Sequence, residues 1–274
     1  MKKIYSVILN LFLEGIKMVK LGICSSIENI DMVGDAGYSY IETSVGSIMK
    51  LMQDEFEEYL RKMNNSKINI EVCNCLFPGN IKLVGDELDY EQVKQYISNA
   101  LDRVSQLGVD IVVFGSGGSR RIPEGYDRIK AKEQFINVMK IVGEEASKYN
   151  ITIVLEPLNR SETNLMNSVK EGLELVKEVA HPNIKLLADY YHMRKESENL
   201  NILNEATAYI KHCHIAHGQT RQYPSSEDKD KYAEFIKILI QNKYEGRISI
   251  EGKTNDLKKD AKEAKKLLDH IITY

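Results

Sequence analysis

Four apolar, strand-like runs in this chain each end in a residue that can bind a metal ion, and they recur at the spacing of strand–helix units. Successive run ends lie 33 (156 to 189), 25 (189 to 214) and 37 (214 to 251) residues apart, which leaves room each time for one helix and two loops. In a (β/α)8 barrel the C-terminal strand ends converge on one mouth, so we expect these four residues to meet there. The runs are I-T-I-V-L-E, I-K-L-L-A-D, I-K-H-C-H and R-I-S-I-E, ending at Glu156, Asp189, His214 and Glu251.

From Val19 onward, strand and helix patterns alternate without a Pro/Gly/Ser-rich linker. The length of 274 residues is close to the roughly 250 residues of one barrel domain. We therefore predict an α/β fold, a single-domain (β/α)8 TIM barrel over residues 18–274. The expected strands cover 19–24, 38–43, 67–74 and 109–114, and four more end at 156, 189, 214 and 251. The expected helices start near 27, include Phe56, Tyr59 and Leu60, cover 90–107, end near 149, and cover 169–179, 200–206, 232–242 and 257–271.

Residues 1–17 form an N-terminal extension to this pattern. Lys2 and Lys3 precede an apolar stretch, as in a signal peptide, but Asn10 interrupts it and a small-residue cleavage site is lacking. An added helix, or an upstream start codon ahead of Met18, is favoured. The sequence holds no run of about 18 apolar residues, so we expect no membrane span.

Charge and cysteine content bound the partners and the compartment. A net charge of −3 and a pI near 6.1 give no broad field for a phosphate backbone, so nucleic acid is a poor candidate partner. The four cysteines all fall in predicted strands and form no C-x-x-C pair. They are typical of buried thiols in a reducing, cytoplasmic protein.

Two Glu, one Asp and one His aimed at one spot predict a site for one divalent metal ion, because packed carboxylates would otherwise repel one another and protonate. Such a shell favours Mn2+ or Mg2+ and allows Co2+, with Zn2+ less suited to a site without thiolates. Two simpler interpretations stay open. Glu156 would be a strand-end charge paired with Arg160, and Asp189 would cap the following helix.

Other polar residues near the predicted mouth have more than one interpretation. His192 is expected beside Asp189, facing substrate or supporting a ligand. His212 shares a strand face with His214 one pleat deeper, and is the alternative ligand. Glu42 ends the second strand and would bind substrate or remain a surface carboxylate.

The longest irregular stretches follow the fourth, fifth and seventh strands, where loops usually bind substrate. In the first of these, the glycine-rich residues 115–118 offer backbone N–H groups for a phosphate, helped by Arg120 and Arg121. A flexible loop with solvated arginines explains the same pattern, and a lone glycine cluster is weak evidence.

The ordered set of motifs carries a family resemblance. The segments E-P-L-N-R-S-E at 156–162, D-Y-Y-H at 189–192, H-C-H at 212–214 and I-E-G at 250–252 resemble the xylose-isomerase-like sugar isomerase/epimerase superfamily. The closest branch is the ketose 3-epimerases of the D-tagatose/D-psicose type and related sugar phosphate isomerases and epimerases. The resemblance runs from about Met18 to the C-terminus.

This resemblance implies roles for individual residues. Glu156 and Glu251 would be metal ligands and also the acid/base pair, and Asp189 and His214 would complete the metal shell. Substrate oxygens would be held by Glu162, His192 and Arg221. The implied reaction is proton transfer next to a carbonyl through an enediolate, which needs a base and, for an epimerase, an acid on the opposite face. The implied partner is a small carbohydrate, and a homodimer or homotetramer is an open expectation.

Several alternatives remain. The chain has no Trp and begins its first strand with G-I-C-S-S, unlike a typical ketose 3-epimerase pocket, so a keto-inositol, hydroxypyruvate or a phosphorylated sugar is also a candidate substrate. An endonuclease IV type of nuclease would need three zinc ions and early-strand histidines, but His181 is the first histidine in this sequence. A non-catalytic sugar-binding protein is the third class.

Overall fold

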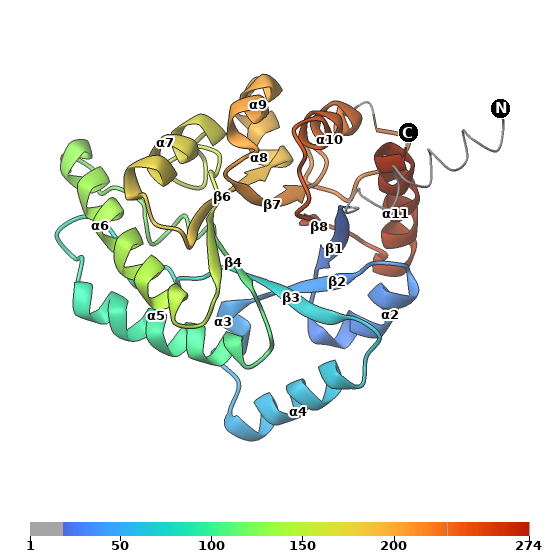
Figure 1. Ribbon diagram of the computed structural model, residues 1–274, viewed down its shortest axis with the longest axis horizontal. Coiled ribbons are helices and arrows are strands. Elements are labelled where there is room, and N and C mark those ends of the chain that lie inside the picture. The colour runs from blue at the N-terminus through green and yellow to red at the C-terminus, as the bar shows by residue number, and fades with distance from the viewer. Residues whose placement is uncertain (1–18, 229, 274) are drawn as a thin grey trace, which may run out of the picture.

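Eight parallel strands close into a barrel within residues 19–228 and 230–273, the part of the chain that the computed structural model describes (Figure 1). Each strand pairs with the next one in sequence, and β1 pairs with β8 to close the ring. The predicted single barrel is confirmed, whereas the N-terminal extension 1–17 lies outside the described residues. The strands are β1 (Lys20–Cys24), β2 (Tyr40–Ser44), β3 (Asn69–Asn74), β4 (Ile111–Phe114), β5 (Thr152–Leu155), β6 (Ile184–Asp189), β7 (Ile210–Ile215) and β8 (Arg247–Ile250).

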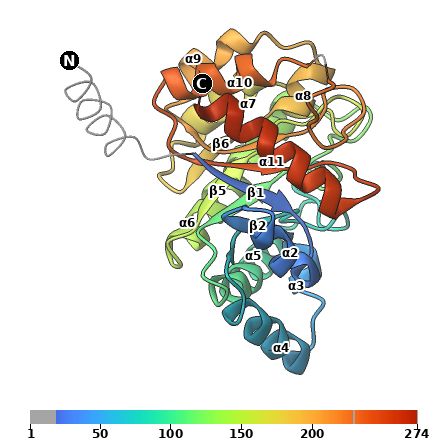
Figure 2. The ribbon, with the colours of Figure 1, turned by 90° about the vertical axis from the view of Figure 1, so that its right-hand side faces the viewer.

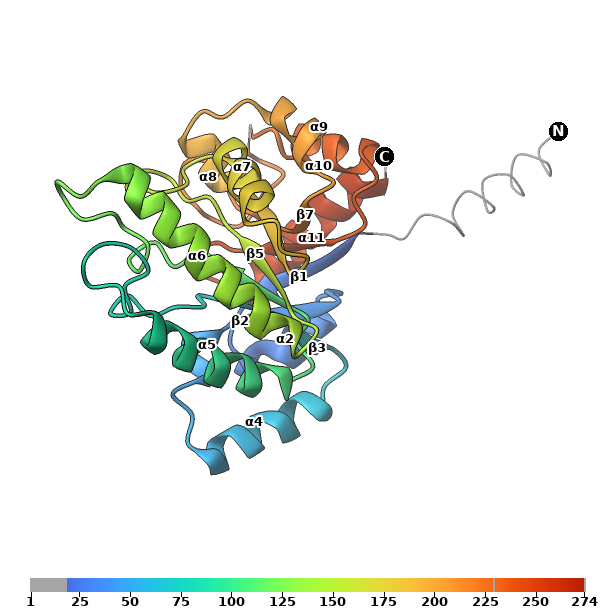
Figure 3. The same ribbon diagram turned by 60° about the vertical axis from the view of Figure 1, so that its left-hand side comes forward.

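Helices surround the barrel on the outside (Figures 1 and 2). The two long helices α5 and α6 run side by side (Figure 3), and α11 packs against α10 and α2. In the described part of the chain, no helix combines the length and the apolar character needed to cross a membrane. The helices are η1 (Ile27–Asn29), α2 (Ile30–Asp35), α3 (Val45–Ile48), α4 (Gln53–Asn64), α5 (Tyr90–Ser105), α6 (Arg128–Ser147), α7 (Val169–Val179), α8 (Tyr190–Lys195), η2 (Leu200–Ile202), α9 (Leu203–Ala206), α10 (Tyr232–Gln241) and α11 (Leu257–Thr273).

Helix α5 shows how the sequence defines these elements. Asp89 precedes the helix, and its carboxylate accepts hydrogen bonds from the main-chain N–H groups of Glu91 (2.9 Å) and Gln92 (3.1 Å). Such an N-cap contributes about 1 kcal/mol. The buried side chains recur at helical spacing and form one apolar stripe against the barrel. These side chains are Val93, Ile97, Ala100, Leu101 and Val104.

Two short helices were not predicted. Helix α3 follows β2 directly and α8 follows β6 directly, both at the C-terminal side of the barrel. They have four and six residues, which is too short for a helical period to be read from apolar spacing. The second of them carries His192 and therefore belongs to the site.

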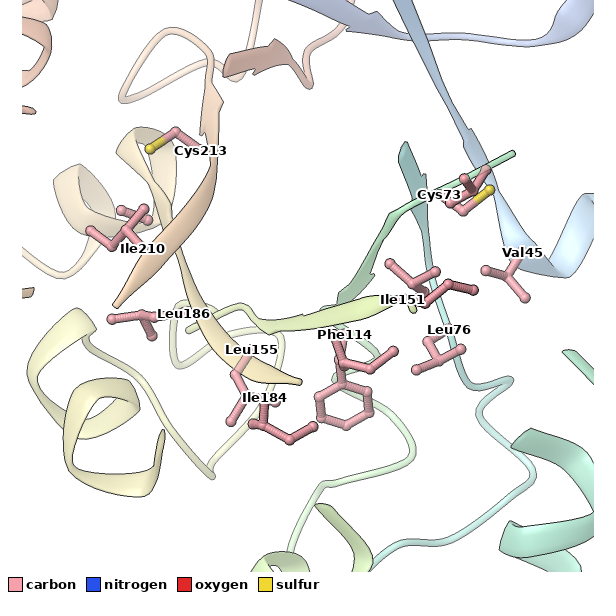
Figure 4. Close-up of a cluster of buried hydrophobic side chains, with 14 of the residues drawn as sticks. Val45, Cys73, Leu76, Phe114, Ile151, Leu155, Ile184, Leu186, Ile210 and Cys213 are labelled. Atoms are coloured by element: carbon pink, nitrogen blue, oxygen red, sulfur yellow. The ribbon is translucent and has the colours of Figure 1, made fainter. Parts of the chain in front are cut away.

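Strand alternation separates two apolar layers. Phe114, Leu155 and Leu186 lie in the layer between strands and helices, part of which Figure 4 shows, and the ring of Phe114 packs against Phe135 of α6 at 5.6 Å between centroids. A second, smaller cluster fills the barrel axis. Since side chains alternate along a strand, the next inward positions after this inner cluster lie at the mouth. The inner cluster comprises Tyr40, Val72, Ile111, Val113, Val154 and Leu187.

Candidate metal centre

The last inward positions of four neighbouring strands bring four potential metal ligands together. Each residue offers one ligand atom, and these atoms all lie within 4.8 Å of one another. They come from the ends of β5 to β8, as the spacing of the four runs predicted. The metal-ligand role of the group remains a prediction. Its members, called the ligand group below, are Glu156, Asp189, His214 and Glu251.

His214 occupies the centre of this arrangement and is fully buried. Its Nδ1 lies 3.0 Å from Oε1 of Glu156 and 3.7 Å from Oε2 of Glu251. Its Nε2 lies 2.9 Å from Oε1 of Glu42, on the other edge of the ring. Burial opposes a charged imidazole, but the three surrounding carboxylates raise the pKa of His214 well above its usual value. With Nε2–H donated to Glu42, Nδ1 is the nitrogen that faces the other members of the ligand group.

The carboxylates of the ligand group crowd one another. Burial, followed by the charge of Glu156, raises the pKa of Asp189 to about 8. Burial is also the largest reason why the pKa of Glu251 is raised. Burial acts against ionisation of Glu156 too, but the adjacent His214 outweighs it and the pKa is lowered overall. Three buried carboxylates and one imidazole nitrogen form a donor set that suits a divalent cation, which would offset this repulsion.

Glu42 has a position that neither earlier interpretation described. Its side chain is fully buried, so the surface-carboxylate interpretation is wrong. It accepts a hydrogen bond from Nε2 of His212 at 2.8 Å as well as from Nε2 of His214. His212 also contacts Oγ of Ser249 at 3.3 Å, one layer deeper in the barrel. The structure therefore places His214 in the ligand group and His212 below it, bound to Glu42.

The simpler interpretations of Glu156 and Asp189 have different outcomes. Arg160 pairs with Glu196, not with Glu156, so the first is wrong. Asp189 does cap α8, because its Oδ1 accepts a hydrogen bond from the main-chain N–H of Tyr191 at 2.7 Å. The cap and the ligand group coexist, because Asp189 also offers an oxygen to that group.

His192 faces the ligand group from α8. Its Nδ1 accepts a hydrogen bond from the main-chain N–H of Asn159 at 3.1 Å. Burial lowers the pKa of His192 to about 3, so the ring is neutral near pH 7 and its proton resides on Nε2. Within residues 19–228 and 230–273, Nε2 makes no hydrogen bond, although Oδ2 of Asp189 is 3.4 Å away. A buried N–H without a partner beside the ligand group is suited to donate to a bound oxygen.

Arg221 links the loop after β7 to two of the glutamates. It donates to Oε2 of Glu251, and its Nη1 lies 3.2 Å from Oε1 of Glu162. Its guanidinium lies 4.9 Å from the ring centroid of Tyr191. The structure thus brings Glu162, His192 and Arg221 to the rim of the ligand group, as the resemblance implied, while their contact with substrate remains a prediction.

Asn159 was not singled out from the sequence, although it lies inside the E-P-L-N-R-S-E segment. Its side-chain NH2 donates to Oε1 of Glu162 at 3.0 Å. The same side-chain nitrogen lies 2.9 Å from Nδ1 of His192. Asn159 is 2% exposed, so it holds the two predicted substrate contacts in one rigid unit.

The glycine-rich loop after β4 differs from both of its interpretations. Arg120 is fully buried, so the solvated interpretation is wrong for this residue. Its Nη2 donates to the main-chain carbonyl of Glu156 at 2.7 Å, and its guanidinium packs over Phe114 at 5.4 Å. Arg121 is exposed and donates to the carbonyl of Ser161 at 3.4 Å. The buried guanidinium is directed at the site loop and away from solvent.

A hollow of about 270 Å3 opens at the ends of β1, β2 and β3. Cys24 and Glu42 line this hollow and also lie beside His214, which places the hollow next to the ligand group. Among the described residues that line it, none is Lys or Arg. Its other lining residues are Ser25, Ser26, Thr43, Ser44, Ser47 and Asn74.

A parallel barrel with a carboxylate–histidine group at its mouth agrees with what known families show. The chain matches a family model described as a xylose isomerase-like TIM barrel over residues 30–274. The chain belongs to that family, which confirms the resemblance seen in its motifs.

Individual relatives are sugar epimerases by name. A probable ketose 3-epimerase of Synechocystis sp. is 26% identical over 211 residues, which are 73% of this chain and 70% of that protein. A D-psicose 3-epimerase of Ruminiclostridium cellulolyticum is 25% identical over 166 residues, 59% of this chain and 55% of that protein. A D-psicose 3-epimerase from Clostridium cellulolyticum H10, solved with D-tagatose, has a TM-score of 0.83 at 19% identity, covering 93% of this chain and 99% of that one. At this identity the structural likeness shows the fold.

Proposed function

We propose that the chain is a divalent-metal-dependent sugar isomerase or epimerase that moves a proton on a carbon next to a carbonyl. The observation that carries the proposal is the placement of Glu156 and Glu251 on either side of Nδ1 of His214, at 3.0 and 3.7 Å, within one buried ligand group. Two carboxylates that approach one spot from different strands are suited to remove a proton on one face of a substrate and return it on the other. A sugar-binding protein without catalysis has no need of such a pair.

The residues around the pair would hold the substrate. The Nε2–H group of His192, which lacks a partner in the described chain, would donate to a substrate oxygen. Glu162 and Arg221, which contact each other at 3.2 Å, would bind hydroxyl groups at the rim. Arg221 also donates to Glu251 and would keep that carboxylate oriented toward the reacting carbon.

The ligand group fits a metal ion by its donor chemistry. Glu156, Asp189, His214 and Glu251 would hold one divalent ion, with Mn2+ preferred and Mg2+, Co2+ or Zn2+ as alternatives. When bound, such an ion supplies positive charge that polarises the substrate carbonyl and stabilises the negative charge that develops on its oxygen.

We propose an uncharged ketose or a related keto sugar as the substrate. The hollow beside the ligand group is lined by hydroxyl, amide and thiol side chains and, in its described lining, by no Lys or Arg, so it suits sugar hydroxyls better than a phosphate. The names of the relatives, a ketose 3-epimerase and a D-psicose 3-epimerase, point the same way. The four described cysteines are free, which supports a reducing compartment such as the cytoplasm.

A substrate screen tests the proposal. The purified protein, loaded with Mn2+, is incubated with ketoses, keto-inositols, hydroxypyruvate and sugar phosphates, and isomer formation is followed by chromatography. We expect turnover of an unphosphorylated ketose and none by Glu251→Gln. Turnover confined to a keto-inositol or hydroxypyruvate would replace the substrate but keep the chemistry. Sugar binding without turnover would identify a binding protein, and incision of abasic DNA would identify a nuclease.

A further inference from the structure

The glycine-rich loop after β4 occupies a special place in the layer of inward-facing residues at the mouth. Val113 points into the barrel, so the next inward position on this side of the ring is Gly115. A Cβ atom at Gly115 would lie 2.3 Å from Oε2 of Glu156. The space that a side chain of β4 would fill is therefore taken by the carboxylate of the neighbouring strand.

The second glycine of the loop faces the other end of the site segment. A Cβ atom at Gly117 would lie 2.8 Å from the main-chain carbonyl oxygen of Glu162 and 3.1 Å from Cδ1 of Leu158. The third glycine differs, because the nearest atom to a Cβ at Gly118 is Cα of Gly79 at 3.7 Å, an ordinary van der Waals distance. Two of the three glycines thus make close contacts that a side chain would abolish.

Hydrogen bonds hold this loop firmly against the segment that follows β5. Arg120 donates to the carbonyl of Glu156 from a fully buried position. The side chain of Asn164 accepts from the main-chain N–H of Ile122 at 2.8 Å and donates to its carbonyl at 2.9 Å. At the other side of the loop, Oγ of Ser116 accepts from the main-chain N–H of Phe77 at 2.9 Å. The loop cannot retreat from an added methyl group without breaking these contacts.

We propose that residues 115–122 form a positioning template for the site. Gly115 sets where the Glu156 carboxylate lies within the ligand group, and Gly117 separately sets the main chain that carries Glu162. This inference rests on the proposed function for the roles of the two glutamates. It gives the glycine-rich loop a task other than the phosphate binding that its composition suggested.

Three alanine substitutions in one loop test the template. In Gly115→Ala the added methyl displaces a flexible carboxylate end, so we expect a Tm close to that of the unaltered protein but Mn2+ affinity weakened by about 10–100-fold, the range for residues that orient ligands. In Gly117→Ala we expect Mn2+ affinity to be kept and KM to rise about tenfold or more. The control, Gly118→Ala, should leave Mn2+ affinity, kcat and KM unchanged.

The outcomes separate the template from the proposed function. Equal Mn2+ affinity in Gly115→Ala and Gly118→Ala would overturn the inference, as would identical loss of metal in Gly115→Ala and Gly117→Ala, because a general folding defect would produce it. If the unaltered protein binds no Mn2+, the proposed function fails. In that case, crystal structures of Gly115→Ala and Gly118→Ala decide the template. A Glu156 carboxylate displaced only in the first supports it, and one displaced in neither refutes it.

Discussion

The carboxylate of Glu42 lies 2.9 Å from Nε2 of His214, on the opposite edge of the imidazole from the ligand group. Both side chains are fully buried. A carboxylate in this place fixes which nitrogen carries the proton and how the ring is turned, and it makes the other nitrogen a better ligand. Glu42 is thus a support for the centre although it belongs to the distant strand β2.

Replacing Glu42 tests this support. Glu42→Gln should weaken Mn2+ binding by about 10–100-fold, because a neutral amide no longer stabilises the proton on Nε2 of His214. Titration with Mn2+ under competition from a chelating dye measures the change. Ser249→Ala is the matched control, since Ser249 contacts His212 in the layer below. Equal affinities of Glu42→Gln and the control would show that the contact with His214 does not tune the site.

Metal content can be tested at Asp189. Elemental analysis of the purified protein should find about one divalent ion per chain, and Asp189→Asn should lose it because the substitution removes a ligand charge. Asn is also a good N-cap, so the hydrogen bond that starts α8 can persist and circular dichroism should be unchanged. Three zinc ions per chain would contradict the single-ion centre and favour the nuclease class.

Glu162 separates substrate binding from metal binding. Glu162→Gln should leave metal content and Tm nearly unchanged and raise KM about tenfold or more, because a charged hydrogen-bond partner is lost at the rim. Steady-state kinetics and elemental analysis measure the two effects. Arg160→Ala, in the same loop but paired with Glu196, should change neither. Loss of metal from Glu162→Gln would place this carboxylate among the ligands.

The mechanism predicts exchange with solvent. Because a carboxylate removes the proton and a carboxylate returns it, product formed in D2O should carry deuterium at the reacting carbon. Mass spectrometry of the product measures this. Glu156→Gln and Glu251→Gln should each lower kcat by at least about a hundredfold. Product without deuterium from the active protein would favour direct hydrogen transfer between carbons.

The pH dependence of stability follows from the buried charges. In the metal-free protein, the pKa of Asp189 is raised to about 8 and that of His214 is raised as well. Between the ordinary pKa of histidine, about 6.5, and pH 8, the folded state therefore binds more protons than the unfolded state, so stability should fall as pH rises. His192, with a pKa lowered to about 3, is neutral in both states over most of this window and contributes little.

Calorimetry checks this prediction. The Tm of the metal-free protein should be lower at pH 8 than at pH 6.5, and the increase in Tm on adding Mn2+ should be larger at pH 8, where the ligands need to release fewer protons. In Asp189→Asn the fall should be smaller. A metal-free Tm that rises from pH 6.5 to 8 would contradict the arrangement of charges described for the ligand group.

The barrel and the ligand group were predictable because both depend on strand ends. In a parallel barrel every strand ends at the same mouth, so Glu156, Asp189, His214 and Glu251 converge whatever the detailed packing. The short helices α3 and α8 were missed because fewer than two turns leave no readable period. The sequence placed His192 near the mouth but did not predict that it would belong to a helix.

The contacts between distant segments were beyond sequence reasoning. The pairing of Glu42 with His214 depends on how the strand ends align around the closed ring, and a residue at a strand end looks the same whether it faces solvent or a buried histidine. Asn159 and Gly115 act through distances below 3.2 Å to other loops, and such distances are set only once the loops pack. Composition suggested a phosphate loop at 115–118, whereas packing gave its glycines to the neighbouring glutamates.

Asp189 ends β6 with one oxygen capping α8, the helix that carries His192, while the residue also belongs to the ligand group. A single carboxyl group thereby joins the two halves of the mouth. Any cation that orders this carboxyl group also orders the helix from which a sugar would be gripped. By thermodynamic reciprocity, a sugar bound through that helix must tighten the hold on the cation by the same factor, so cation and sugar are expected to bind with positive cooperativity.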